Sequence, residues 1–173
     1  MQVNLPLDLE DKMKTGTISY GAAAALRFLG EKDRAAVCEF LVKLRASSSL
    51  MKEFSEHILD ISKRDGISAF EILNAENVKK ITDMECSRKI KTEKLRQLLR
   101  AIRYPALTAK ENEMENALKK LALPQNMSLR RPENFEGKKV SLTIRFENTA
   151  QLKKAIAEID TKTALLDKFL ELL

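Results

Sequence analysis

A chain of 173 residues fits one ordinary domain or two small domains joined by a linker. Its composition, 44% hydrophobic and 32% charged, indicates a folded globular protein and excludes a disordered one. The 31 basic residues exceed the 25 acidic ones and give a net charge of +6, which favours a polyanionic partner without identifying it.

Targeting and metal-binding signals are absent from the sequence. The opening MQVNLPLDLEDK lacks the basic and apolar regions of a signal peptide, and no stretch has the 18 or more apolar residues of a transmembrane helix. The two cysteines, Cys38 and Cys86, lie far apart, with no further Cys or His nearby at metal-ligand spacing. We therefore expect a cytoplasmic protein with no membrane partner, no metal and no cofactor.

Residues 1–83 predict a small domain of short helices. Leu5-Pro6 opens a helix that ends at Gly16, and Ser19 caps an alanine-rich helix that ends at Gly30. Apolar residues at helical spacing predict a helix from Asp33 and another after the serine run 47–49, the latter ending at Gly66. Ser68 and Glu71 form a capping box that starts the next helix.

Residues 84–123 predict a basic helix followed by a second helix. In the segment 87–103 the only acid is Glu93, and seven residues are basic: Arg88, Lys89, Lys91, Lys94, Arg96, Arg100 and Arg103. Tyr104-Pro105 ends this helix, and a second capping box at Thr108 and Glu111 predicts the start of the next. The basic helix carries a charge of +6, equal to that of the whole chain.

Residues 124–173 predict a strand followed by two helices. The segment 124–137 holds Pro124, Pro132 and Gly137 and is interpreted as a linker or hairpin arm. Apolar and polar residues then alternate over 140–146, as in a half-buried strand, and Asn148 caps the first of the two helices. The predicted fold class is mainly α, a small helical bundle followed by a C-terminal α+β unit.

The predicted strand needs a partner, because a lone strand leaves unpaired amides and carbonyls on each edge. A short hairpin arm at 127–131 covers one edge only. Pairing the other edge with a second copy would form a four-stranded antiparallel sheet under the last helices of both chains. A monomer in which a helix of the first domain covers the edge is the alternative. The residues expected in this dimer interface are Val140, Leu142, Ile144, Phe146, Leu152, Ile156, Leu166 and Phe169.

The sequence offers no catalytic centre. The single histidine, His57, lies at helical spacing among apolar residues, where a structural or solvated role is typical. Phosphate loops, nucleophile elbows and HExxH motifs are absent, and the carboxylates Glu111, Glu113 and Glu115 are interpreted as a solvated helix face. We expect a protein that is not an enzyme.

One segment resembles a known family. Leu5-Pro6 and the sequence from Gly16 to Leu26 resemble the ParB-type partition proteins, in which an "LP" segment is followed by a "G-x-I-S-x-G-H-A-R-A-L" helix. The matching residues are Gly16, Ile18, Ser19, Gly21, Ala23, Ala25 and Leu26. The stretch to about residue 73 resembles the latter part of the central DNA-binding domain, and the C-terminal strand and helices are similar to the family's dimerisation domain.

The chain departs from the family in three places. The family's His and Arg in that helix are Ala22 and Ala24 here, the chain begins where the recognition helix ends, and the arginine-rich nucleotide box has no counterpart. The sequence is therefore interpreted either as a fragment of a longer partition protein or as a short relative of one.

Two functions agree with these patterns. The first is a nucleoid-associated homodimer that contacts the DNA backbone through its basic helix, with a full-length partition protein as a further candidate partner. The second is a helical protein–protein adaptor whose basic helix binds an acidic protein. Within the chain, the same helix could also pair with the acids at 111, 113 and 115.

Overall fold

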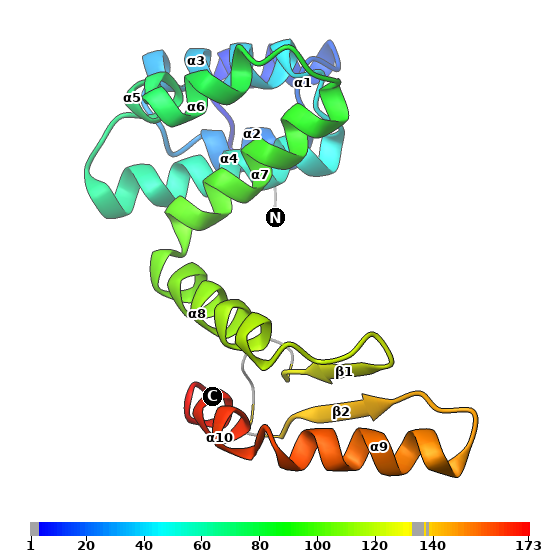
Figure 1. The fold of residues 1–173 in the computed structure, drawn as a ribbon. Helices are drawn as coiled ribbons and strands as arrows, with labels where there is room; N and C mark the ends of the chain where they lie inside the picture. Colours follow the sequence, from blue (N-terminus) through cyan, green and yellow to red (C-terminus); the bar gives the residue numbers. More distant parts are fainter. Residues whose placement is uncertain (1–3, 133–136, 138) are drawn as a thin grey trace. The chain divides into compact units, whose positions relative to one another are not determined.

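The computed structural model describes residues 4–132, 137 and 139–173 and divides the chain into two compact units. The first unit ends at Pro105 and the second begins at Ala106. The predicted fold class is confirmed, since most described residues are helical and a small antiparallel sheet lies near the C-terminus (Figure 1). In the part that the structure describes, no helix is long and apolar enough to cross a membrane.

Helix α4 is the centre of the first unit, because α2, α5 and α7 all pack against it. Its core side chains include Phe54, Ile58 and Ile61, each fully buried. The helices of this unit are α1 Leu7–Lys14, α2 Tyr20–Leu26, α3 Glu31–Lys43, α4 Ser48–Asp65, α5 Ala69–Asn74, α6 Glu76–Thr82 and α7 Arg88–Arg103.

Three predicted helix ends in this unit are confirmed by their capping contacts, whereas α2 ends at Leu26 and not at the predicted Gly30, which instead precedes the first residue of α3. Ser19 Oγ accepts the N–H of Ala22 at 3.2 Å. Ser68 and Glu71 make both hydrogen bonds of the capping box. Gly66, which ends α4, has a left-handed backbone with φ of 67°, a conformation that costs glycine little.

Helix α7 belongs to the first unit because its apolar face is part of that unit's core. Leu95 and Leu99 are fully buried there, and Leu98 and Ile102 pack beside them. The sequence suggested segments divided near residues 83 and 123, whereas the compact units divide at Pro105. The i, i+4 spacing of the buried leucines directs both side chains toward α4.

The second unit is an α-β-β-α-α arrangement. Strands β1 and β2 pair antiparallel, with Met127 opposite Ile144 and Leu129 opposite Leu142. Met114, Leu121 and Phe169 form its small buried core. Its elements are α8 Pro105–Leu121, β1 Met127–Arg130, β2 Ser141–Ile144, α9 Thr149–Asp160 and α10 Thr163–Glu171.

Two predictions for the second unit need correction. Helix α8 begins at Pro105 and not at Thr108, because the fixed φ of proline suits the first helical position. Thr108 is therefore inside the helix, and its buried Oγ1 has no hydrogen-bond partner among the described residues. Strand β2 covers Ser141–Ile144, shorter than the predicted 140–146, because ladder pairing with β1 ends at Ile144.

Candidate nucleic-acid interface

The seven cations of α7 differ in their surroundings along the helix. Arg88 and Lys89, in the first turn, are exposed and make no ion pair with any described residue. Lys91 and Lys94 lie against the connection from α6, where the Lys91 ammonium donates to the Thr82 carbonyl at 2.6 Å. Within the described part of the chain, the cations in the N-terminal half of α7 therefore form no ion pair with an acid.

Lys94 is exposed and its ammonium lies 3.5 Å from the Met84 sulfur, a weak acceptor. Ser87 caps the helix by accepting the N–H of Ile90 at 3.4 Å.

Helix α6 packs against α7 and adds two exposed lysines, Lys79 and Lys80. Of these, Lys80 lies 3.6 Å from Glu76, in a pair so exposed that water screens it.

The C-terminal half of α7 is bound to α4. The Arg96 guanidinium is 2.7 Å from the Glu53 carboxylate, which raises the pKa of Arg96 above its usual value. Seven residues later, Arg103 forms an ion pair with Asp60, also seven residues after Glu53. The two ion pairs are therefore about two turns apart on both helices and follow the same chain direction. Together they hold α7 against α4.

His57 lies between these two ion pairs. It is 6% exposed, and its Nδ1 accepts a hydrogen bond from Arg103 Nη1 at 2.7 Å. Its proton is therefore on Nε2, which is 3.7 Å from Glu53 and has no hydrogen-bond partner among the described residues. Burial, and then the nearby Arg103 charge, lower the pKa of His57 below its usual value. The imidazole is thus held neutral and orients Arg103.

Sequence reasoning did not identify Glu53, His57 and Asp60 as partners of the basic helix. Their i, i+4, i+7 spacing places them on one face of α4, and this periodicity was the available signal. The acids considered as partners lie in the second unit, where Glu111 is 3.2 Å from Arg131 and Glu115 is 2.8 Å from Lys119. The seventh cation, Arg100, is half-buried.

The expected interface residues of the second unit fall into three groups. Leu142, Phe146 and Ile156 are exposed, at 39%, 49% and 48%. Phe169 is fully buried in the core of its own unit. The rest are half-buried: Val140, Ile144, Leu152 and Leu166. The free edge of β2 has no strand beside it among the described residues, since the sheet holds β1 and β2 alone.

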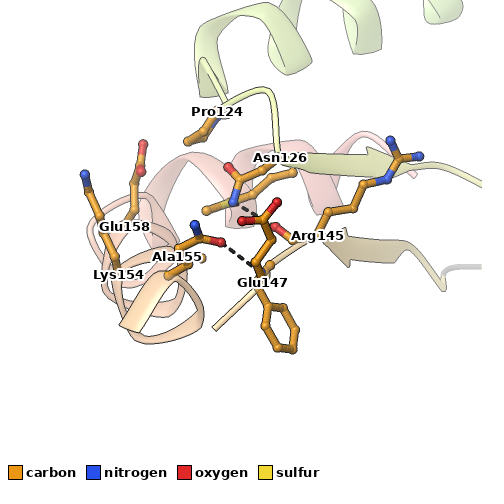
Figure 2. A pocket seen from close by; sticks show the side chains of 10 residues that line it. Pro124, Asn126, Arg145, Glu147, Lys154, Ala155 and Glu158 are labelled. Carbon is orange, nitrogen blue, oxygen red and sulfur yellow. Dashed lines mark hydrogen bonds between the residues drawn. The ribbon is translucent and has the colours of Figure 1, made fainter. Parts of the chain in front are cut away.

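A cavity of about 560 Å³ lies between the end of β2 and α9, and Figure 2 shows it from close by. Its polar groups bond to one another: Asn126 donates to the Arg145 carbonyl at 3.1 Å, and the Glu147 amide donates to Gln151 at 2.8 Å. Lys154 on α9 adds a cation to the cavity, whereas the Arg145 side chain points away from the cavity. This hollow has no concentrated charge of either sign. Among the described residues, no cluster of His, Cys, Asp and Glu suits a metal ion.

Comparisons with known proteins add no relative. No family model matches the chain. Searches of curated proteins and of solved structures found no match either.

Proposed function

We propose that the chain is a DNA-associated protein of the ParB partition type, which binds the phosphate backbone through α7 and forms a homodimer through its second unit. The observation that carries the DNA proposal is the exposed, unpaired charge at the start of α7. Arg88 and Lys89 are directed to solvent with no acidic partner among the described residues, and Lys94 follows along the helix. Phosphates attract such cations independently of sequence.

The ion pairs of α7 limit which of its cations can contact phosphate. Arg96 and Arg103 already bind carboxylates of α4, and moving either onto a phosphate would leave Glu53 or Asp60 without its cation. We therefore assign the phosphate contacts to Arg88, Lys89 and Lys94. Arg96 and Arg103 act by holding the helix in place.

A titration of duplex DNA across salt concentrations tests this assignment. Fluorescence anisotropy with a labelled 24-base-pair duplex should show binding that weakens as salt rises. Replacing Arg88, Lys89 and Lys94 by alanine should reduce the slope of log affinity against log salt by about 3, close to one per lost phosphate contact.

The matched control replaces Lys14, Lys32 and Lys43, three exposed lysines of α1 and α3, and so changes the net charge equally. An equal loss of slope in this control would show a general charge effect and refute the α7 site. No binding to duplex even at low salt would overturn the DNA proposal and favour an adaptor with an acidic protein partner.

The dimer proposal is supported by the open edge of β2 and the apolar side chains around it. Leu142 on β2 and Ile156 on α9 are exposed although their neighbours form a core. A second copy paired along β2 would satisfy the free backbone groups and remove these side chains from water.

Sedimentation of the full chain and of a Leu142→Lys/Ile156→Lys variant tests the dimer. The chain should sediment as a dimer and the variant as a monomer. Leu7→Lys/Val42→Lys, which changes exposed apolar residues of α1 and α3, is the control and should remain a dimer. A monomeric wild-type chain, or a variant that stays dimeric, would refute the interface.

The partition assignment itself is supported by the sequence likeness in α2. At its Gly21 a Cβ would lie 2.9 Å from the Lys52 side chain of α4, so the shared glycine has a packing reason. Ala22, where the family has histidine, is fully buried, so a larger side chain there would have to displace its neighbours. The likeness therefore concerns how α2 packs, and the DNA contact is argued from α7.

A further inference from the structure

Phe28, just after α2, is an exposed aromatic ring between two cations. Its side chain is 55% exposed. The Arg27 guanidinium lies 4.4 Å from the ring centroid and the Lys63 ammonium, from the last turn of α4, lies 4.6 Å from it. Two segments that are distant in sequence thus bring their charges to one ring.

No acid among the described residues neutralises either cation. In the part of the chain that the structure describes, Arg27 and Lys63 make no ion pair, whereas the nearby Arg64 pairs with Asp65 at 2.7 Å. A hollow of about 400 Å³ adjoins the ring and is lined by Asn4, Leu5 and Pro6 together with Arg27 and Phe28. None of the described residues that line this hollow is a carboxylate, so the surface is suited to an anionic ligand with a flat apolar part.

We propose that Arg27, Phe28 and Lys63 form a binding site for single-stranded nucleic acid. The flanking phosphates draw the guanidinium of Arg27 and the ammonium of Lys63 away from the Phe28 ring, and an unpaired base stacks on the ring face that they leave. Aromatic rings beside cations bind single strands in this way, because every base has a π-face and every nucleotide a phosphate. In a duplex the base faces are covered by their neighbours, so the ring selects unpaired strands.

This site consists of Arg27 and Phe28, just after α2, and Lys63 of α4, and it involves none of the α7 cations assigned to duplex DNA. The inference rests on the proposed function in one respect, since both take a polynucleotide as the ligand. A test must therefore report on the Phe28 ring itself and not on total binding.

The chain has no tryptophan, so Phe28→Trp introduces a single fluorescent reporter at the site and keeps an aromatic ring there. We expect a twelve-residue oligothymidylate to quench its emission, since a stacked base is in contact with the indole. The matched reporter is Tyr20→Trp, another exposed aromatic position on α2 with no cation over its ring among the described contacts, and its emission should not change. Thymidine monophosphate should quench Phe28→Trp only at far higher concentration, because it offers one phosphate.

Binding of labelled oligothymidylate to the otherwise unchanged chain gives the second readout. Phe28→Ala should weaken it about tenfold, the usual effect of losing one stacked base. Arg27→Ala/Lys63→Ala should weaken single-strand binding further. Arg88→Ala/Lys89→Ala should weaken single-strand binding less than it weakens duplex binding.

The outcomes separate the two proposals. If the single strand binds but Phe28→Trp emission is unchanged, the Phe28 site is refuted and the α7 proposal stands. Equal quenching by the mononucleotide and the strand would also overturn the strand site. If neither single strand nor duplex binds, the proposed function fails as well.

Discussion

Replacing Arg103 by alanine should loosen the junction between α7 and α4 without unfolding the second unit. Arg103 makes two polar contacts of different character, and its guanidinium also lies 4.8 Å from the centroid of the Tyr104 ring. Its ion pair with Asp60 involves a carboxylate that is 47% exposed, and its hydrogen bond reaches the buried ring of His57. The variant removes these contacts and leaves the buried Nδ1 of His57 without a hydrogen-bond donor.

The expected cost follows from these two environments. The exposed ion pair contributes at most about 1 kcal/mol, because water screens it. Leaving the buried His57 acceptor unpaired costs about 1–3 kcal/mol. We expect a total near 2 kcal/mol, or about a 30-fold change in the local opening equilibrium.

Amide hydrogen exchange read by mass spectrometry measures this change where it occurs. Peptides from α4 and from the end of α7 should exchange about 30-fold faster, while peptides from α9 serve as the internal reference and stay unchanged. Asp60→Ala removes the exposed ion pair alone and should accelerate exchange only about threefold. Arg88→Ala, at the unpaired start of the same helix, is the control and should have almost no effect. Equal exchange in Arg103→Ala and Arg88→Ala would refute the assigned role of Arg103.

Three further predictions concern stability. The free energy of unfolding should fall between pH 7 and pH 5, because the lowered pKa of the single histidine, His57, makes the unfolded chain take up its proton first, near its usual pKa of about 6.5. The fall should be smaller in His57→Leu, and urea titrations with identical pH profiles would contradict this. Leu99→Ala, which empties a fully buried site, should cost about 3 kcal/mol in urea denaturation, and a cost below about 1 kcal/mol would mean that α7 is not part of the core. Asn148→Ala removes the hydrogen bond that Asn148 accepts from the Gln151 amide at 3.0 Å; it should cost about 1 kcal/mol and accelerate exchange in the first turn of α9, and unchanged exchange there would count against the cap.

The sequence by itself determined most helices of the first unit and several of their ends, although it did not separate α6 from α5. Ser19, Ser68 and Asn148 cap helices through bonds to amides three residues ahead, so the pattern and the contact lie within the same few residues. Such local signals failed where two of them competed. Thr108 and Glu111 have the spacing of a capping box, but the helix begins about a turn earlier, at Pro105, so that Thr108 lies inside it.

Only the tertiary structure decided which charges of the basic helix are available to a partner. Composition and periodicity identify seven equivalent cations in the segment, since each is a Lys or Arg on an amphipathic helix. Arg96 and Arg103 differ from Arg88 because their carboxylate partners lie 43 residues earlier in the chain, on α4. Those partners come within reach only when Leu95 and Leu99 are buried against that helix. A net charge can be read from the sequence, but its neutralisation depends on distances that packing sets.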